Sequence, residues 1–412
     1  MISVHDALMT ILETVAPLAG ERVSLLQAVG RVLAEEIRSA REVPPFANSA
    51  MDGYAVRWED ICDADPDVPV HLDILEVIQA GAVPQYAVTT GTASKIMTGA
   101  VMPHGADTVI RVEDTEEHDG RVWIKRQERV GSHIRESGED IHPGQKVLEK
   151  GRVLRPADIG LLASVGRSFV LVHQRPRVAI LSTGNELVEV DQTLHPGQIV
   201  NSNAYTLAAA VQEAGGVPVP LQIAQDTLEE IRAALNEAVR HDVVLSTGGV
   251  SVGDFDFVKA AMDELGIHRL FWQVAQKPGK PLTFGLLRER PYFGLPGNPV
   301  SALVCFYLYV RPALAKMTGH EKPFLPVVSA TIGEDIPKAK GLTEFVRCRL
   351  VSSKGQYEVH STGSQSSGVL SSLSLGEGLV IGPAELPLLP KGLHVKVIVL
   401  HSDQFSGSEA PF

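Results

Sequence analysis

The chain has 412 residues, with 37 Lys and Arg against 49 Asp and Glu, so its formal net charge is −12. At about 150 residues per domain, this length predicts two to four domains. The content of 44% hydrophobic and 21% charged residues is ordinary for a globular protein. The acidic balance argues against a general nucleic-acid binder, which would carry a basic face. An anionic small ligand remains compatible, because local Lys and Arg act within a Debye length of about 8 Å.

The cysteine and histidine patterns argue against metal-binding and disulfide-rich classes. Cys62, Cys305 and Cys348 lie far apart and form no CxxC pair, and no HxH or HExxH spacing occurs. A disulfide framework and a cysteine- or histidine-rich metal site are therefore not expected. A reducing, cytoplasmic location fits this cysteine usage.

The N-terminal segment reads as an amphipathic helix and not as a signal peptide, because apolar residues at 8, 11, 12 and 15 follow helical spacing and no basic leader precedes them. Ser24, with Gln27 three residues later, predicts a capping box that opens a second helix. A further helix is predicted from Arg155 to Gly166. Between these helices, short β-like runs at 70–74, 109–112 and 122–124 alternate with turn residues. We therefore predict a helical, elongated domain at 1–45 and 145–176, with a β-rich module inserted at 46–144.

Strands and helices alternate from 177 to 326. Apolar strands are predicted at 178–181, 217–224, 243–245 and 292–295, and helices at 204–214, 227–240, 257–265 and 299–317. This alternation predicts a central, mainly parallel α/β domain. The apolar stretch from 292 to 310 is interrupted by Pro296-Gly297-Asn298-Pro299, so no membrane span is expected. The tail at 327–412 is β again, with a hairpin at 344–362 and a closing strand at 393–400, which predicts a small C-terminal β-barrel or sandwich.

Two strands of the α/β domain end in the same signal, Ser-Thr-Gly. In open parallel sheets, ligands bind beyond the carboxyl ends of the strands, and small residues there let backbone N–H groups approach an anion. The alternative is a pair of tight strand-to-helix turns. We favour a site for a phosphate or pterin-type ligand, and its candidate residues are Ser182, Thr183, Gly184, Gly248, Gly249, Ser251, Gly253 and Asp254.

Two further segments of this domain favour anions. Lys277-Pro278-Gly279-Lys280-Pro281 places two ammonium groups on one restricted turn, and ammonium groups suit phosphate. Pro296 and Asn298 precede the long helix, whose N-terminus is a ready anion site. The plainer alternatives are a solvated turn and a helix cap supplied by Asn298.

Carboxylates near these loops fit a divalent cation. Glu186 and Asp256 follow the two glycine-bearing loops, and Asp226 precedes Thr227 in what resembles a capping box. Each can simply be a first-turn helix carboxylate. Acids gathered at a phosphate site would repel the ligand unless a cation lies between them, so we favour cation binding.

Three polar turns in the β module complete the set. They contain Asp52, Thr98 and Asp140, in Asn48-Ser49-Ala50-Met51-Asp52-Gly53-Tyr54, Met97-Thr98-Gly99-Ala100 and Gly138-Glu139-Asp140-Ile141. Each of them alone indicates no more than a turn.

Taken together and in order along nearly the whole chain, these motifs resemble the MoeA family, the molybdopterin molybdenumtransferases, a module that also forms the C-terminal part of gephyrin. The resemblance extends over Pro45-Phe46-Ala47 before the first turn, and over Leu295 with the prolines that follow it. Ala47 and Asn185 stand where many relatives carry Asp.

The resemblance implies a four-domain homodimer whose active site lies between the α/β domain of one subunit and the β module of the other. The implied reaction converts adenylylated molybdopterin and molybdate, with Mg²⁺, into molybdenum cofactor and AMP. Glu186, Asp226 and Asp256 would handle the metal and water, and Asp52, Thr98 and Asp140 from the facing subunit would orient substrate. Lys277, Lys280 and Ser251 would hold phosphate and pterin. Arg347 and Ser367 match positions where relatives contact anions. The implied partner is the molybdopterin adenylyltransferase, with no nucleic acid and no membrane.

Three other functions stay open at this point. An adenylyltransferase of the preceding step shares the α/β domain but is usually a single small domain. A receptor-binding scaffold would need an exposed apolar or aromatic stripe, which a chain with 5% aromatic residues does not obviously carry. A non-catalytic binding protein would gain little from five carboxylates at 52, 140, 186, 226 and 256.

Overall fold

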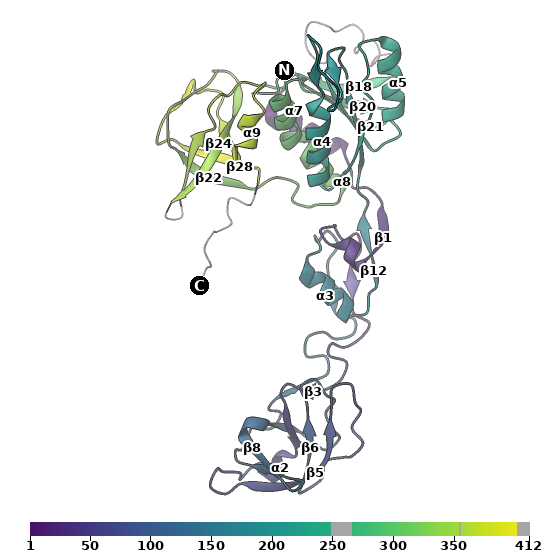
Figure 1. Cartoon of the computed structure of the whole chain (residues 1–412), viewed down its shortest axis with the longest axis vertical. Helices are drawn as coiled ribbons and strands as arrows, with labels where there is room; N and C mark the ends of the chain where they lie inside the picture. The colour runs from purple at the N-terminus through teal and green to yellow at the C-terminus, as the bar shows by residue number, and fades with distance from the viewer. Residues whose placement is uncertain (249–265, 354–355, 402–412) are drawn as a thin grey trace. The chain divides into compact units, whose positions relative to one another are not determined.

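The computed structural model describes residues 1–248, 266–353 and 356–401, and the chain divides into two compact units (Figure 1). Unit 1 comprises Met1–Arg22, Arg31–Ala34 and Leu171–Phe412, and unit 2 comprises Val23–Gly30 and Glu35–Val170. The α/β sheet and the C-terminal β-structure both belong to unit 1. The finer four-part division expected from the sequence stays a prediction.

The central sheet of unit 1 has six strands, in the order β16-β13-β17-β21-β20-β18. Their bounds are β16 (Val217–Pro220), β13 (Arg177–Ser182), β17 (Val243–Thr247), β21 (Arg290–Leu295), β20 (Thr283–Leu287) and β18 (Ile267–Trp272). The first four strands are parallel, as the sequence predicts, and β20 runs antiparallel to both of its neighbours, β21 and β18. Arg288 and Glu289 connect β20 to β21 with φ of 47° and 68°, a hairpin turn that lacks the usual Asn-Gly signal.

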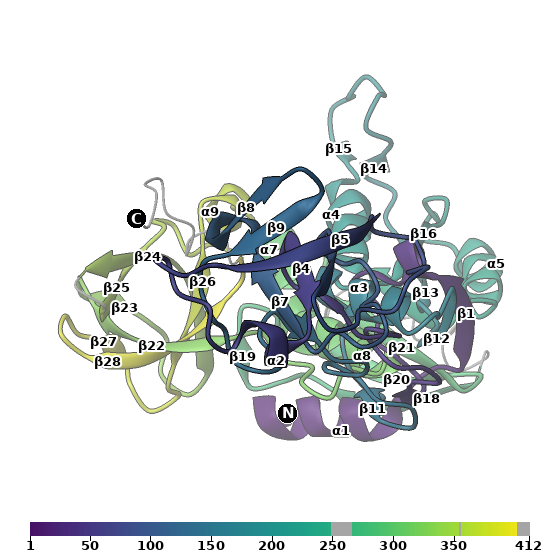
Figure 2. The same ribbon diagram turned by 90° about the horizontal axis from the view of Figure 1, so that it is seen from below.

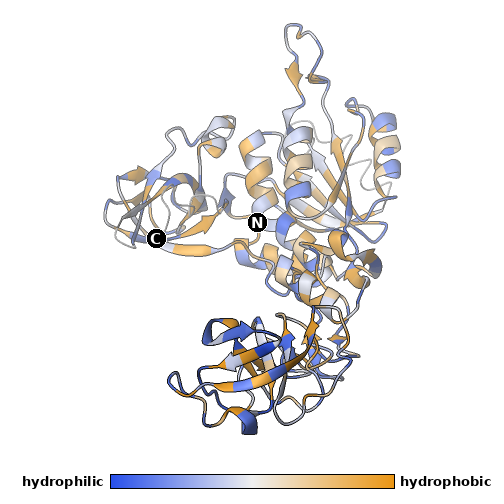
Figure 3. Cartoon of the chain, turned by 60° about the horizontal axis from the view of Figure 1, so that its bottom comes forward, coloured by the Kyte–Doolittle hydropathy of each residue, from blue (hydrophilic) through white to orange (hydrophobic). Residues whose placement is uncertain are grey.

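Helices cover both faces of this sheet because alternate strand residues point to opposite sides. Val178 and Ile180 of β13 pack with α1 (Val4–Thr14) and α4 (Ser202–Glu213), whereas Ala179 and Leu181 pack with α5 (Leu228–Ala238). The hydrophobic residues of the sheet strands stand out in Figure 3. The predicted helix at 257–265 lies outside the described residues.

The long helix predicted at 299–317 forms, but its middle is not an α-helix. It runs as α7 (Pro299–Cys305), a π-helical segment η3 (Phe306–Val310) and α8 (Arg311–Met317). The Arg311 N–H bonds to the Phe306 carbonyl, five residues back. Pro312 cannot donate an amide hydrogen bond and would crowd the carbonyl of residue 308 in a regular helix, which accounts for the wider turn. The whole run is apolar enough to cross a membrane, yet 78% of its most apolar window is buried inside the protein.

The C-terminal strands close into a five-stranded barrel, which confirms the expectation of a small β-barrel. The order β24-β25-β22-β28-β26 returns to β24. The bounds are β22 (Val327–Ile332), β24 (Thr343–Ser353), β25 (Gln356–Ser361), β26 (Gly378–Gly382) and β28 (His394–Val399). A further strand from the α/β region, β19 (Gln276–Lys277), pairs with β24. Phe345 of β24 is buried in the same apolar cluster as α7, so the barrel and the α/β domain share part of one core.

The module of unit 2 is a six-stranded sheet in the order β7-β4-β6-β5-β9-β8, with only the β5–β6 pair parallel. The bounds are β4 (Gly53–Val56), β5 (Val70–Ile78), β6 (Thr92–Ile96), β7 (Thr108–Arg111), β8 (Thr115–His118) and β9 (Arg121–Ile124). Tyr54, Leu72 and Ile110 pack in its core, next to the short helix α2 (Trp58–Ile61). The β-rich prediction for this segment is confirmed.

The segments predicted as a helical domain contain less helix than expected. The capping pair Ser24 and Gln27 forms, with the Ser24 hydroxyl 2.9 Å from the Gln27 Oε1, but it opens only one turn of 3₁₀ helix, η1 (Leu25–Ala28). Gly30 follows with φ of 74° and ends it. The other predicted helix forms as α3 (Pro156–Ser164). A capping box therefore marked the start of a helix correctly and said nothing about its length.

The remaining elements are short strands and single helical turns. They are β1 (Gly20–Ser24), β2 (Ile37–Arg38), β3 (Asn48–Ser49), η2 (Val112–Asp114), β10 (Ile134–Arg135), β11 (Lys146–Leu148), β12 (Phe169–His173), β14 (Leu187–Val188), β15 (Ile199–Val200), β23 (Ile336–Pro337), α9 (Ser371–Ser374) and β27 (Leu388–Leu389).

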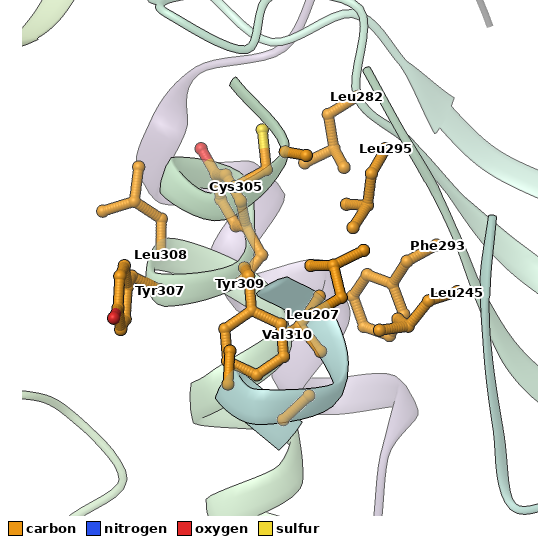
Figure 4. Close-up of a cluster of buried hydrophobic side chains, with 14 of the residues drawn as sticks. Leu207, Leu245, Leu282, Phe293, Leu295, Cys305, Tyr307, Leu308, Tyr309 and Val310 are labelled. Atoms are coloured by element: carbon orange, nitrogen blue, oxygen red, sulfur yellow. The ribbon is translucent and has the colours of Figure 1, made fainter. Parts of the chain in front are cut away.

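A buried polar network fixes the turn after β19 against α7. The Tyr309 hydroxyl donates to Oε1 of the fully buried Gln276, whose amide nitrogen donates to the Pro278 carbonyl at 3.0 Å. Gly279 has φ of 90°, and a Cβ there would lie 2.4 Å from the Cys305 Sγ. Figure 4 shows Cys305 and Tyr309 on the helix that supports this turn.

We predict that Gly279→Ala destabilises the protein by more than about 2 kcal/mol, because it adds a positive-φ strain and a clash in a packed core. Gly341→Ala is the matched control: its φ is 93°, but nothing lies within 4 Å of the added Cβ. Chemical denaturation of both variants measures the difference. Equal loss in the two would show that the clash with Cys305 contributes nothing.

Candidate functional site

The carboxyl ends of β13 and β17 border a cleft of about 60 Å³. The parallel register brings Ser182 opposite Thr247, and Thr247 opposite Leu295 of β21. The cleft is lined by Thr183, Glu186, Leu187, Ile199, Val200, Asn201, Ser202, Asn203, Thr247, Gly248 and Gly297. The two Ser-Thr-Gly signals predicted to form one site therefore do meet, as far as Gly248. Gly249, Ser251, Gly253, Asp254 and Asp256 lie outside the described residues.

Hydrogen bonds beneath the cleft hold its walls together. The Ser182 hydroxyl donates to the Asn201 Oδ1 at 3.0 Å, and the Thr247 hydroxyl lies 3.3 Å from the Ser182 oxygen. Asn201 is the N-cap of α4 and also accepts from the Ala204 N–H. Ser182, Thr247 and Asn201 are all buried. Ser182 thus supports the site from below and does not face a ligand, which differs from its expected binding role.

Thr183 carries a buried polar group of the cleft that no described residue pairs with. Its side chain is buried, with 6% exposure, and its hydroxyl has no hydrogen-bond partner among the described residues. Burying a hydroxyl without a partner costs free energy of about 1–3 kcal/mol. A Cβ on Gly248 would lie 3.0 Å from this hydroxyl and 2.5 Å from the Thr183 carbonyl. Because Gly248 has no side chain, its backbone can lie close to the Thr183 hydroxyl. A polar ligand bound here would supply the hydrogen-bond partner that no described residue provides.

Glu186 lies at the rim of the cleft, and its carboxylate sits over Gly184, where a Cβ would come within 2.6 Å of it. Asn185 Oδ1 accepts from the Asp226 N–H at 3.1 Å, which joins the two loops that carry Glu186 and Asp226. The helix cap that the sequence assigned near Asp226 is Thr227 alone, whose hydroxyl accepts from the Glu230 N–H. Asp226 is exposed and outside the helix, so it does not cap α5.

An arm made by β14 and β15 forms one wall of the cleft. Its loop projects away from the sheet in Figure 2. Leu187 and Ile199 line the cleft from this arm. Asn203 and Gly297 also line the cleft, and the Asn203 side-chain amide donates to the Gly297 carbonyl at 2.8 Å. Asn201 and Asn203 were not singled out from the sequence. The signal for them is the Asn201-Ser202-Asn203 run at the start of α4, which is typical of a helix start.

The two lysines of the 277–281 turn have different surroundings. The Lys277 ammonium lies 3.0 Å from the Glu344 carboxylate of β24, whereas Lys280 is exposed and has no ion pair among the described residues. The turn itself is anchored by the buried Pro278 and Gly279. Pairing with Glu344 was not expected, because the sequence places the two residues 67 positions apart.

The N-terminus of α7 is closed by the barrel. Asn298 occupies the N-cap position, as predicted, but its side chain makes no capping hydrogen bond. The Val300 N–H instead bonds to the Ser367 carbonyl at 3.2 Å. Pro296 is buried, while Asn298 is exposed, so only the latter can face solvent or a ligand.

Arg347 is buried to 1% exposure and holds the loop that carries Ser367. Its Nη2 donates to the carbonyls of Ser364 and Ser366 at 3.1 and 3.0 Å, and its Nε donates to the Ser372 hydroxyl. Burial lowers the pKa of the guanidinium. Much of its hydrogen-bonding capacity is therefore spent within the protein, and Ser367 is the half-buried neighbour that this arrangement presents.

In unit 2, Asp52 and Thr98 meet. The Asp52 Oδ1 accepts from the backbone N–H and the hydroxyl of Thr98, both at 2.7 Å, and these bonds lower the pKa of the Asp52 carboxyl. Both residues are exposed at the ends of neighbouring strands β4 and β6. Asp140 is exposed as well, with its N–H bonded to the Val43 carbonyl. Within the described part of unit 2, no hydrogen bond or ion pair joins Asp140 to Asp52 or Thr98.

No group of three His, Cys, Asp or Glu side chains that could hold a metal occurs within the described ranges. Mg²⁺ commonly takes only one or two protein carboxylates and completes its shell with water and substrate phosphates. Glu186 at the cleft and the nearby Asp226 loop fit that sparse donor set.

Comparison with known proteins covers almost the whole chain. Three family models match it: the MoeA N-terminal region (domains I and II) at residues 2–166, the probable molybdopterin binding domain at 179–316 and the MoeA C-terminal region (domain IV) at 329–400. The chain is 38% identical to the molybdopterin molybdenumtransferase of Nostoc sp., over 97% of this chain and 94% of that protein. It is 36% identical to the one of Bacillus subtilis, over 95% and 92%. The crystal structure of a molybdopterin biosynthesis MoeA protein from Pyrococcus horikoshii superposes with a TM-score of 0.84 at 32% identity, covering 98% of this chain and all of that one.

We predict that Thr183→Val raises the free energy of unfolding by about 1 kcal/mol or more, because it removes a buried hydroxyl that no described residue satisfies. Thr247→Val is the control and should lose about 1 kcal/mol, since its hydroxyl is bonded to Ser182. Denaturant titration distinguishes them. A large loss in Thr183→Val would mean that its hydroxyl is satisfied within the folded chain.

We predict that Thr98→Val raises the pKa of Asp52 towards, but not to, its ordinary value of 3.8, because the backbone N–H bond remains. The lowered pKa means that this pair stabilises the fold above that ordinary value and that the effect is lost as the pH falls through the folded-state pKa. Carboxyl NMR titration measures the shift. Thr115→Val, whose hydroxyl bonds to a backbone carbonyl instead, should leave Asp52 unchanged.

Proposed function

Because the chain belongs to the MoeA family, we propose that it transfers molybdenum from molybdate to adenylylated molybdopterin, with release of AMP and formation of molybdenum cofactor. The observation that carries the proposal is the cleft at the carboxyl ends of β13 and β17, where the buried Thr183 hydroxyl has no partner among the residues that the structure describes. Ligands of open α/β sheets bind at this edge. The curated relatives named above are called molybdopterin molybdenumtransferases.

In this proposal the pterin and its pyrophosphate bind along this edge of the sheet, and a polar group of the ligand enters the cleft. Thr183 bonds a polar group of the ligand, and Gly184 and Gly248 let the ligand approach the backbone. Gly249 belongs to the same motif by sequence. Glu186, Asp226 and Asp256 orient water and hold Mg²⁺ when it is bound, and Mg²⁺ would then neutralise charge on the pyrophosphate. Asn185, through its bond to the Asp226 N–H, holds the second acidic loop in place. Ser251, Gly253 and Asp254 complete the glycine-bearing loop.

Molybdate is a tetrahedral dianion, so donors and cations should hold it. We assign this role to Ser367 and Asn298 at the entrance of α7, and also to Lys277 and Lys280, in addition to the phosphate and pterin contacts that the family resemblance implies for these two lysines. Arg347 contributes by holding the Ser367 loop, and its positive charge lies behind that loop. Ammonium groups bind such oxyanions as flexible point charges.

Asp52, Thr98 and Asp140 act in the proposal from the facing subunit of a homodimer, where they orient substrate. The Thr98 hydrogen bonds lower the pKa of Asp52 and keep it ionised, which suits a carboxylate that orients substrate by accepting hydrogen bonds. The adenylylated substrate would come from a molybdopterin adenylyltransferase in the cytoplasm, by direct contact with this protein.

The deciding experiment incubates the purified protein with adenylylated molybdopterin, Mg²⁺ and molybdate and follows AMP release. We expect AMP only when molybdate is present, together with activation of a molybdenum apo-enzyme. Binding of the precursor without its cleavage would instead indicate a carrier or a scaffold and would overturn the proposal.

We predict that Glu186→Gln lowers the rate of AMP release by about 100-fold or more, because a carboxylate that orients water is lost. Glu189→Gln is the matched control, since Glu189 is exposed on the same arm and does not line the cleft. Both variants should keep the wild-type melting temperature. Near-normal turnover of Glu186→Gln would remove Glu186 from the catalytic set.

A further inference from the structure

A buried carboxylate of the barrel contacts the cation turn of the α/β domain. The Glu344 side chain is 4% exposed, and its Oε1 lies 3.0 Å from the Lys277 Nζ. Its other oxygen accepts from the Ala339 N–H at 3.1 Å. The Lys277 side chain remains 47% exposed. An ammonium has three N–H donors, so this pairing leaves two of them for a ligand.

Backbone contacts fix both members of this pair. Lys277 lies opposite Glu344 in the parallel β19–β24 pairing, and the Thr343 N–H bonds to the Ala275 carbonyl at 3.1 Å. On the other side, the fully buried Gln276 bonds to Tyr309 and Pro278. Lys277 is thus held at its backbone by the strand pairing and at its ammonium by Glu344. Lys280 has no such partner among the described residues.

We infer that Glu344 is a positioning residue for oxyanion binding, which acts by holding the Lys277 ammonium in place over the 277–281 turn. This inference rests on the proposed role of that turn in binding molybdate. A lysine that is already ordered loses less side-chain freedom when an anion binds than a free one does. The barrel of the same chain therefore takes part in the oxyanion site through one side chain.

Electrostatics alone predicts the opposite effect. Removing a carboxylate next to Lys277 makes the turn more positive and would strengthen anion binding by Coulomb attraction. Loss of the positioning of Lys277 would instead weaken anion binding. The direction of the change in affinity therefore separates a positioning residue from a mere counter-charge.

The test is calorimetric titration of the full-length protein with molybdate, comparing the wild type with Glu344→Gln. We expect the dissociation constant to rise by about 5- to 10-fold, as expected for ordering one long side chain. The KM for molybdate should rise in parallel while kcat at saturating molybdate stays within about 2-fold, since the interaction acts on binding. Glu344→Asp, which keeps the charge with a shorter reach, should lie between the two.

A double-mutant cycle with Lys277→Gln shows whether Glu344 acts through Lys277. In the Lys277→Gln background, Glu344→Gln should have no further effect on molybdate affinity. The double variant removes both charges, so it leaves no unpaired buried carboxylate.

The outcomes are distinct. A dissociation constant of Glu344→Gln at or below that of the wild type overturns the inference and leaves the proposed function intact. An effect of Glu344→Gln that persists without Lys277 also overturns it. No molybdate binding by the wild type overturns the oxyanion role of the turn itself, and the inference with it.

Discussion

The parallel register of β13, β17 and β21 is the constraint on which the rest of the site depends. Parallel strands must all end at the same edge of a sheet, so the loops after Ser182, Thr247 and Leu295 are brought together whatever their own sequences are. The buried Ser182–Asn201 bond then fixes α4 to that edge. Everything that lines the cleft follows from this arrangement: two glycine turns, the arm from β14 to β15 and the unpaired hydroxyl of Thr183.

The barrel adds a second constraint. Its strand β24 runs past the α/β domain and uses three side chains in different ways: Phe345 packs in the shared apolar core, Arg347 holds the Ser367 loop and Glu344 pairs with Lys277. Charged groups are costly to bury without partners. The guanidinium of Arg347 therefore donates to specific acceptors, and the carboxylate of Glu344 accepts from specific donors. Those partners are the segments proposed to bind the oxyanion, so stability and binding depend on the same contacts.

Some expectations failed for identifiable physical reasons. The hairpin between β20 and β21 carries Arg288 and Glu289 at positive φ, where Gly or Asn is usual, so its antiparallel pairing was missed. The π-helical turn before Pro312 forms because the proline ring would clash with the carbonyl of residue 308 in a regular helix, which helix propensity does not predict. The short helix after Ser24 ends at Gly30, which a capping signal does not foretell. The side chain of Asn298 does not cap α7, because Ser367 of the barrel supplies an acceptor for its first turn.

The sequence by itself determined the classes of structure and the loops that carry the chemistry, since strand and helix periodicity and the order of the Ser-Thr-Gly and Lys-Pro-Gly-Lys segments are local properties. The sequence also determined the family, because its motifs match those of the MoeA family, in the same order, along nearly the whole chain. Only the tertiary structure decided which polar groups are spent on the fold and which remain for a ligand. Ser182 and Arg347 make hydrogen bonds within the protein, the Thr183 hydroxyl has no partner in the described part of the chain, and Lys277 pairs with Glu344. These outcomes depend on contacts between residues far apart in the chain, and no local pattern encodes them.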